Sequence, residues 1–464
     1  MLRRAILIGM ALLLLLAIQP ERGLFPSDAD RLALVRARES GAHLTEWRLL
    51  AGFVRANPKD AESWERMGVL DHLSGLCEQA VYEFEQASAF KQLSASGLVS
   101  YGECLLTLGQ FQAATDLLAP RLGTTESSPG LELLLAKAYL RLDDLKNADH
   151  AIRVWAEREP DNSRASMYLG LYQALTNPVD ALTTLQALAD QSDEYYSAYH
   201  LVQTAINKGE LQDNAPYRAL ELGRAYGSLG EWELALYAFT SAVQQDPRYT
   251  EAHAWLGEAQ QQLGEDGSTE LGKALMLNPK SILAQAMLAL TLQRQGDAEG
   301  ALDALQQIAA QDTEDPQWLI ALGQARAQMG DLEGALSEYQ KAIALAPENT
   351  SVWQAIAEFS LSYQYQVYSV GTPAANKAVL LAPHNPRSLD LAGQAALSNA
   401  EQDEAEGYFR AAIQFDPRYA PAHLHLALVL FQQEDNEAAY QELQKAAALG
   451  SAEALNLLEQ VSTQ

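Results

Sequence analysis

Only a few residues of this chain have side chains and spacings that suit metal binding or catalysis. His423 and His425 are two positions apart, and on a helix that spacing points the two imidazoles to different faces, which makes a poor metal site. We expect His423 to occupy a core position instead. Gly264, Gly267 and Gly272 form a glycine-rich stretch, but the strand that precedes a phosphate-binding loop is missing. The sequence therefore predicts no metal site and no nucleotide site.

Neighbouring carboxylates occur as Asp143-Asp144 and Glu434-Asp435. Both pairs fall at expected turns between helices, where solvated acids and helix caps are ordinary. The chain contains no G-x-S-x-G, H-E-x-x-H or C-x-x-C sequence, so the common signatures of nucleophilic and metal-dependent enzymes are absent. We therefore expect no catalytic residue, no cofactor and no metal, and hence a protein that is not an enzyme.

The composition limits both the fold and the partners. Of the 464 residues, 48% are hydrophobic. Ala and Leu are abundant and long β-branched runs are missing, which favours a helical array over a sheet protein. The 60 acidic and 32 basic residues give a formal charge of -28. Such a charge repels a phosphate backbone, so we expect no nucleic-acid partner.

Residues 1–26 are the only net-positive part of the chain and are interpreted as a targeting segment. Arg3 and Arg4 precede an apolar run from Ala5 to Ile18, which as a helix spans about 21 Å, short of a hydrocarbon core of about 30 Å. We favour an uncleaved signal anchor, because no A-x-A-like cleavage site follows. A cleaved signal peptide and a buried amphipathic helix are the alternatives. The signal anchor and the signal peptide both place everything after Pro20 outside the cytoplasm. With the anchor, this segment alone attaches the protein to the membrane; with a cleaved signal peptide, the protein is secreted.

The remaining sequence repeats itself at a period of 34 residues, which is typical of stacked helix pairs. Small residues at repeat positions 8 and 20 let two helices approach closely, and large residues at positions 4, 7, 11 and 24 fill the space around them. A Gly near position 15 permits the left-handed backbone that ends the first helix, and a Pro near position 32 stops the second. The copy that starts at Pro216 has Leu222-Gly223, Tyr226, Gly230, Ala235, Phe239, Ala242 and Pro247.

This pattern resembles the tetratricopeptide repeat family, and the resemblance covers nearly everything from residue 27 to the C-terminus. It implies an all-α fold, a right-handed helical solenoid of about 12 helix-turn-helix units with a C-terminal capping helix. We expect the cap at 451–461, with Ala452, Leu455, Leu458 and Val461 as its apolar stripe. The units start at Ser27, Ala61, Ala95, Pro129, Ser163, Pro216, Thr250, Ile282, Pro316, Thr350, Pro386 and Ala420.

Two places break the period. The first contains a helical stretch from Glu194 to Asn207 that is expected to end at Lys208-Gly209. It is either an unpaired helix that packs into the stack and bends it, or a hinge or partner platform. The predicted parts of the chain are the targeting segment 1–26, an N-terminal array 27–195, the extra helix 196–215, a C-terminal array 216–453 and the cap 454–464.

The second break lies at 360–372, where Tyr363, Tyr365 and Tyr368 replace the usual turn. These three tyrosines could anchor a ligand. Alternatively, they fold onto the neighbouring helix pair.

Cys77 and Cys104 are the only cysteines. In the tetratricopeptide repeat family, the helices that carry them are packing neighbours and both positions usually face the core. The resemblance therefore permits a disulfide in an exported protein. Two free, buried thiols are the alternative.

Solenoids of this family line a concave surface with their first helices, chiefly through repeat positions 2, 5, 9, 12 and 13. Here the lining mixes amides with scattered Leu and Ile, which suits an extended or helical protein segment. The Lys and Asn set with which some family members clamp an acidic C-terminal peptide is missing. The candidate partner-binding residues are Tyr217, Leu220, Arg224, Leu283, Leu290, Arg294, Ile320 and Gln324.

The sequence leaves three classes of function. We expect an exported, membrane-anchored scaffold that binds protein or peptide partners through its concave surface, for the assembly of an envelope complex. An accessory factor of polysaccharide assembly or export is an alternative that aromatic residues in the groove would favour, and few occur. An enzyme is the third class, and the repeats leave no room for a catalytic domain.

Overall fold

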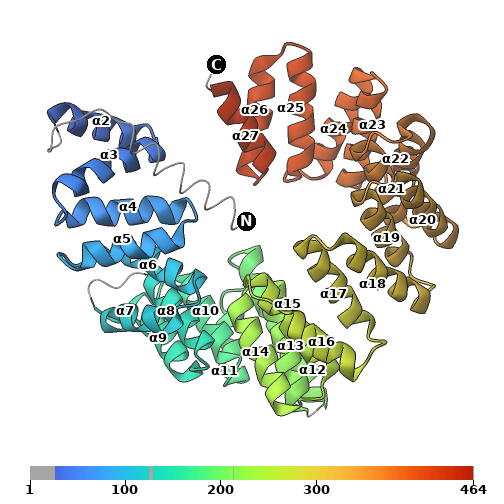
Figure 1. Ribbon diagram of the computed structural model, residues 1–464. Helices are drawn as coiled ribbons and strands as arrows, with labels where there is room; N and C mark the ends of the chain where they lie inside the picture. Colours follow the sequence, from blue (N-terminus) through green and yellow to red (C-terminus); the bar gives the residue numbers. More distant parts are fainter. Residues whose placement is uncertain (1–26, 125–128, 213, 463–464) are drawn as a thin grey trace. The chain divides into compact units, whose positions relative to one another are not determined.

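The computed structural model describes residues 27–124, 129–212 and 214–462, and all regular structure in these ranges is helical (Figure 1). The helices form twelve consecutive pairs, one unpaired helix, α12 (Asp193–Gln212), and a final helix, α27 (Ala452–Ser462). This confirms the predicted all-α repeat array with its capping helix. The predicted targeting segment, residues 1–26, lies outside the described residues. Within the described ranges, no helix has the length and apolar character that crossing a membrane requires.

The chain divides into two compact units, residues 1–252 and residues 253–464. The division falls in the first turn of α15, and α12 packs along α13 inside the first unit. In order, the other helices of the first unit are α2 (Asp28–Glu39), α3 (His43–Ala56), α4 (Ala61–Leu73), α5 (Cys77–Ser88), α6 (Ala95–Thr107), α7 (Phe111–Leu118), α8 (Pro129–Arg141), α9 (Leu145–Arg158), α10 (Ser163–Gln173), α11 (Pro178–Gln186), α13 (Ala215–Ser228) and α14 (Trp232–Gln245), with a short 3₁₀ turn, η1 (Ala119–Arg121).

The second unit continues the same alternation of first and second helices. Its last pair is covered by α27. In order, its paired helices are α15 (Thr250–Gln262), α16 (Ser268–Leu277), α17 (Ile282–Gln295), α18 (Ala298–Gln311), α19 (Pro316–Gln328), α20 (Leu332–Leu345), α21 (Thr350–Ser362), α22 (Thr372–Leu381), α23 (Pro386–Ser398), α24 (Gln402–Phe415), α25 (Ala420–Gln432) and α26 (Asn436–Ala448), with a π-helical turn, η2 (Val367–Gly371).

The turn inside a helix pair is made at repeat position 15, where the backbone is left-handed in eleven of the twelve repeats. Gly230 and Gly330 have φ angles of 79° and 84° there, as predicted for glycine. Asp143, Ala400 and Glu434 occupy the same position with φ angles of 58°, 62° and 65°. A side chain with a Cβ costs roughly 1–2 kcal/mol in this region. The turn geometry is therefore a property of the repeat, and glycine is its least strained solution.

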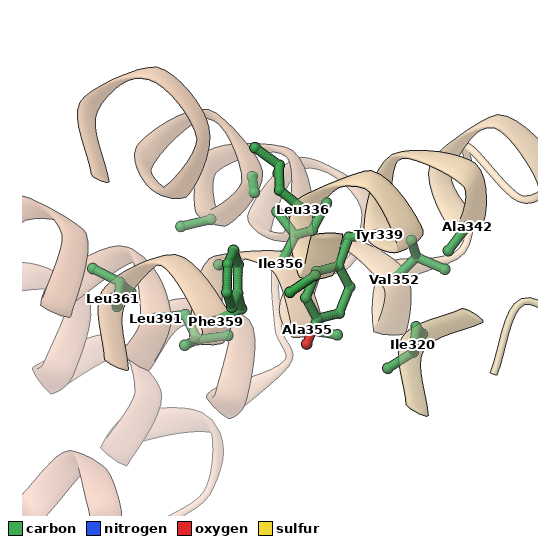
Figure 2. Packing of buried hydrophobic residues seen from close by; sticks show 14 of the residues in the cluster. Ile320, Leu336, Tyr339, Ala342, Val352, Ala355, Ile356, Phe359, Leu361 and Leu391 are labelled. Carbon is green, nitrogen blue, oxygen red and sulfur yellow. The ribbon is translucent and has the colours of Figure 1, made fainter. Parts of the chain in front are cut away.

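The core of each pair forms where a large ring covers a small residue of the facing helix. A Cβ at Gly393 in α23 would lie only 2.5 Å from Cε1 of Phe409 in α24, so this crossing requires glycine. Tyr339 in α20 occupies the equivalent place in its repeat, against Gly323 of α19. Figure 2 shows how Tyr339 also meets Phe359 of α21, with the ring centroids 5.1 Å apart. The same contact pattern thus holds a pair together and joins it to the next.

The extra helix α12 packs into the stack and is longer than predicted. It continues through Lys208-Gly209 to Gln212, so the predicted end at Gly209 is wrong. Gly209 lies inside the helix because α13 crosses there: a Cβ at this position would collide with the side chain of Arg218. Glycine serves this crossing as a small residue and not as a helix terminator.

In the first unit, helices that follow the extra helix α12 contact helices that precede it. α14 contacts α8, and Lys137 of α8 forms an ion pair with Glu233 of α14 at 3.1 Å. The hydroxyl of Tyr168 in α10 donates a hydrogen bond to Glu231, at 2.6 Å. The α8–α14 contact joins helix pairs that are not consecutive, and the Tyr168–Glu231 hydrogen bond spans the unpaired helix α12. They support the interpretation of α12 as an unpaired helix that bends the stack.

The final helix α27 is amphipathic, but its buried face differs from the predicted stripe. Ala454 is fully buried, and Leu457 and Leu458 pack against the last helix pair. Leu455 is exposed, so its predicted place in the stripe is wrong. The helix is rotated about its axis relative to the prediction, since several residues of this segment are apolar and more than one face could be buried.

Candidate functional site

In the first helices of residues 253–464, repeat positions 2, 9 and 13 lie mostly at the surface and position 5 is mostly buried, although Glu258, at position 9 of α15, is buried. In α19, Gln317, Gln324 and Gln328 are exposed, whereas Ile320 is only 6% exposed. Ile320 belongs to the same buried cluster as Val352 of α21. Position 5 therefore faces the next first helix, and positions 2, 9 and 13 remain available to a partner. We call these exposed positions on α15, α17, α19, α21 and α23 the first-helix surface.

Two of the eight candidate partner-binding residues are not available to a partner. Leu220 is 0% exposed and Ile320 is 6% exposed. Both stand at position 5, and the seam between consecutive first helices buries that position. Their assignment to partner binding is therefore corrected: each is part of the core.

The other six candidates lie at least partly at the surface. Leu290 is 47% exposed, and Gln324 is also exposed. Arg294 is exposed, but its guanidinium donates two hydrogen bonds to Glu258 of α15, at 2.8 and 3.0 Å. The remaining three are Tyr217 and Leu283, which are half-buried, and Arg224, which is exposed and bonded to Glu221 at 2.9 Å.

The sequence analysis missed the polar contacts that link consecutive first helices of the second unit. Besides Arg294 and Glu258, the pair of Arg387 and Glu358 joins α23 to α21. His425 Nδ1 lies 2.7 Å from a carboxylate oxygen of Asp390. The partners stand about one repeat apart in the sequence, so a search for complementary residues at that spacing could have found them. They leave most charges of this surface paired.

A cavity of about 400 Å³ opens between the first helices α19 and α21. Its floor includes Tyr339, which comes from the second helix α20 and is 1% exposed as a residue. Burial, followed by the negative charge of Glu358, raises the pKa of Tyr339, so its hydroxyl stays protonated. The cavity is lined by Gln324, Ala327, Gln328, Tyr339, Ala355, Glu358, Phe359, Ser362 and Tyr363.

The three tyrosines of the second break have different surroundings. Tyr363 is exposed and lines the cavity. Tyr365 packs onto the core, with its ring centroid 5.9 Å from that of Phe359. Tyr368 is largely exposed. Both interpretations of this segment thus hold for part of it, since one tyrosine faces a cavity and another folds onto the neighbouring pair.

A second cavity of about 400 Å³ adjoins the extra helix in the first unit. It lies between the ends of α12 and α13 and the outer face of α14. Ile206, Ala219 and Leu222 give it an apolar wall, while Arg218 and Tyr237 supply polar groups. No residue proposed from the sequence lines this cavity, because its shape follows from the unpaired helix.

Asp71 of α4 and Glu83 of α5 form a buried pair of carboxyl groups. Burial, followed by the negative charge of Asp71, raises the pKa of Glu83 to about 9. Burial also raises the pKa of Asp71. The pair therefore retains a proton at neutral pH. Neither residue lines any of the three cavities of about 400 Å³, so we assign the pair to the packing of α4 on α5.

The residues with potential chemistry have structural roles. His423 is buried, as predicted, and its two ring nitrogens lie 2.5 Å from Glu442 and 3.0 Å from the carbonyl oxygen of Pro417. Asp144 and Asp435 cap the following helices, as predicted for the acidic turns. A Cβ at Gly257 would lie 2.8 Å from the carbonyl oxygen of Gly267, so that glycine-rich stretch serves close backbone packing. Across the described ranges, no three metal-binding side chains converge.

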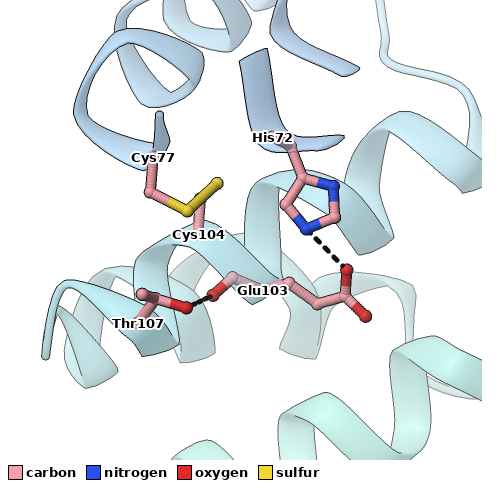
Figure 3. The surroundings of a disulfide bond; sticks show 5 residues. All are labelled: His72, Cys77, Glu103, Cys104 and Thr107. Atoms are coloured by element: carbon pink, nitrogen blue, oxygen red, sulfur yellow. Dashed lines mark hydrogen bonds and ion pairs between the residues drawn. A yellow bond between two sulfur atoms is a disulfide. The ribbon is translucent and has the colours of Figure 1, made fainter. Parts of the chain in front are cut away.

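The two cysteines meet between consecutive repeats. Cys77 begins α5 and Cys104 lies in α6, and a disulfide joins them with their Cα atoms 4.9 Å apart (Figure 3). Beside it, His72 of α4 lies 3.0 Å from the carboxylate of Glu103 (Figure 3). The bond fastens the second helix of one pair to the first helix of the next.

Comparison with known proteins agrees with this architecture. Residues 223–264 match the family described as TPR repeat, and residues 286–350 match the tetratricopeptide repeat. The TPR repeat-containing protein YpiA of Bacillus subtilis (strain 168) is 21% identical over 285 residues, which are 56% of this chain and 67% of YpiA.

Two solved structures are similar over most of their length. The chain in the APC/C hetero-tetramer Cut9-Hcn1 is 15% identical with a TM-score of 0.42, covering 93% of this chain and 96% of that one. Yeast Tom70 is 14% identical with a TM-score of 0.46, covering 94% and 95%. The matched segments identify tetratricopeptide repeats in this chain, and eleven of the twelve helix pairs of the described residues turn through a left-handed residue at the same repeat position.

Proposed function

We propose that the chain is a scaffold that binds protein or peptide partners through the first-helix surface of residues 253–464. One observation carries this proposal: the cavity between α19 and α21 opens at position 9, where Gln324 and Glu358 are both exposed. Leu290 stands at the same position one helix pair earlier and offers an exposed apolar anchor. An anchor beside a cavity is the arrangement that concentrates binding energy in a few residues.

The experiment compares two exposed leucines. Leu290 lies on a first helix and Leu380 on the second helix α22, and both are exposed. We expect Leu290→Ala to reduce capture of partner proteins severalfold from the organism's own envelope fraction, while Leu380→Ala captures as much as the unmodified chain. Quantitative mass spectrometry measures the capture, and circular dichroism checks that both variants melt normally. Equal capture by both variants at unchanged stability would contradict a first-helix binding surface.

We also propose that the repeats are exported, with residues 1–26 as a signal anchor and an envelope assembly as the setting. The support is the sequence alone: two arginines before an apolar run without a recognisable cleavage site. Alkaline phosphatase fused after residue 26 should be active in living cells, and deletion of residues 1–20 should abolish its activity. A fusion that is inactive with the segment present would reject export.

The alternative role in polysaccharide export is not favoured. Stacking of sugar rings needs exposed aromatic faces, and of the three aromatic residues at the cavity only Tyr363 is exposed. Tyr339 and Phe359 also line the cavity but are only 1% and 3% exposed. A catalytic role is not proposed, because the residues that suggested chemistry serve as caps and core contacts.

A further inference from the structure

The cavity between α19 and α21 is rich in hydrogen-bond acceptors and aromatic carbon. Glu358 offers a carboxylate and Gln324 and Gln328 offer amide oxygens, and none of the nine described lining residues is cationic. Tyr339 contributes a hydroxyl that makes no hydrogen bond within the described residues. The residue as a whole is only 1% exposed, but its oxygen is not fully buried, so a donor that enters the cavity could reach it.

Aromatic rings form one wall of this cavity. The ring centroids of Tyr339 and Phe359 are 5.1 Å apart, and those of Phe359 and Tyr363 are 5.8 Å apart. In Figure 2, Tyr339 and Phe359 lie side by side, and the Tyr339 oxygen points toward Ala355, another lining residue. A planar cation can stack on such rings at about 6 Å or less from the centroid.

The electrostatic surroundings favour a positively charged ligand. Residues 253–464 contain 27 acidic and 10 basic residues, a formal charge of -17. Such a field raises the local concentration of cationic partners and repels acidic ones. The carboxylate of Glu358 places a negative charge at the cavity itself, so the attraction of cationic ligands is strongest there.

We propose that the cavity receives an arginine side chain of a partner protein. The proposal rests on the function proposed above and specifies its partner. A guanidinium has five N–H donors in a planar fork and no acceptor, which complements a site with a carboxylate, amide oxygens and an unpartnered hydroxyl. Glu358 accepts a charge-assisted hydrogen bond, Tyr339 accepts a second bond, and the ring of Tyr363 covers the flat face. Lysine fits less well because its ammonium is a compact charge that does not stack in a plane.

The protein already holds an internal competitor for this site. Glu358 is paired with Arg387 of α23, and both side chains are about half exposed, at 49% and 50%. An exposed pair of this kind contributes little stability, so a partner can displace it. We infer that Arg387 occupies the carboxylate in the unbound protein and swings away when the partner's arginine binds.

The test uses the full chain and four fluorescein-labelled peptides of alternating Gly and Ser. Their central residue is arginine, lysine, citrulline or glutamate, and binding is followed by anisotropy. Citrulline has the shape of arginine without its charge, so it isolates the charge-assisted bond. We expect the arginine peptide to bind about tenfold more tightly than the citrulline peptide, the size of effect typical for a hydrogen bond to a charged group. The glutamate peptide should bind weakest.

Four variants test whether the preference for arginine over citrulline arises at this cavity. Glu358→Gln should abolish the discrimination between arginine and citrulline, and Tyr339→Phe should weaken arginine binding without affecting the fold. Arg387→Ala should tighten arginine binding severalfold, because the competitor is gone. Glu348→Gln is the matched control: Glu348 is exposed and paired with Lys377 outside the cavity, so this change should leave the preference intact.

Several outcomes would overturn the proposal. They are equal binding of the arginine and citrulline peptides, no binding of either at millimolar concentration, and an arginine preference that survives Glu358→Gln. If arginine selectivity fails while Leu290→Ala still reduces partner capture, the scaffold function stands and the arginine site is wrong. If selectivity holds while Leu290→Ala captures normally, the cavity is confirmed and the wider first-helix surface is wrong.

Discussion

Phe409→Ala is expected to lower the free energy of unfolding at the C-terminal end of the array by about 3–5 kcal/mol. The ring of Phe409 is fully buried and lies in close contact with Gly393 of the facing helix. Alanine would leave a cavity at this crossing, since the ring of Phe409 is what covers Gly393 and the glycine has no side chain to fill the space. The loss combines the transfer of the ring to water with the cavity that remains.

The measurement should be local, because repeat arrays can lose two-state behaviour. Hydrogen exchange should speed up in α23 to α26 and remain unchanged in the first unit. Phe415→Ala is the matched control on the same helix, where the ring is 45% exposed, and it should cost well under 1 kcal/mol. Similar effects of the two substitutions would show that the 34-residue frame is misplaced at this repeat.

Reduction of the bond between Cys77 and Cys104 is expected to destabilise the first unit by roughly 3–4 kcal/mol. The two cysteines are 27 residues apart in the sequence, and closing a loop of that size removes chain entropy from the unfolded state. Thermal unfolding of protein purified from an oxidising compartment, with and without dithiothreitol, measures the difference. The double variant Cys77→Ala, Cys104→Ala should melt near the reduced protein and should not respond to dithiothreitol.

This prediction depends on compartment as well as geometry. A disulfide persists where the surroundings are oxidising and is rare in the cytosol. Mass spectrometry of protein alkylated before purification would show the state in the cell. Two fully alkylated thiols in protein recovered from the cell exterior would contradict the bond, and an unchanged melting point after reduction would contradict its stabilising effect.

Most of the fold could be predicted because the same residue pattern recurs in successive repeats. The left-handed turn at position 15 favours glycine, and Gly230, Gly264, Gly296 and Gly330 repeat that signal in consecutive copies. Acidic residues directly before a helix, such as Asp144 and Asp435, cap it through local hydrogen bonds. These features depend on neighbours within a few residues, and a sequence shows such neighbours directly.

The errors lie where the environment is set by residues of other repeats. From the sequence, Gly209 predicts a helix end. The structure shows that it is needed inside the helix, because the side chain of Arg218 packs against it. Leu220 and Ile320 share a helix with exposed residues, and only the packing of consecutive first helices shows that position 5 is buried. In α27, Leu455 and Leu458 are equally apolar, and the last helix pair selects which one is covered.

The candidate site was predicted only in part. Gln324 was placed correctly on an exposed face, but the floor of the cavity comes from Tyr339, a core position of the second helix. In most repeats that position is a packing residue. Here the core ring lines a cavity together with Tyr363, the residue that directly follows α21. The sequence marks this break, but not the cavity beside it.

The contact between α8 and α14 has a consequence for how the first unit folds. An ideal repeat array forms by adding one pair to the next, since each pair contacts only its neighbours. Here the ion pair between Lys137 of α8 and Glu233 of α14 joins residues 96 positions apart in the sequence. That contact can form only after the intervening chain has closed a long loop, which carries an entropic cost before any packing offsets it. The first unit therefore gains its final order in a concerted late step, whereas the regular pairs of the second unit can form in succession.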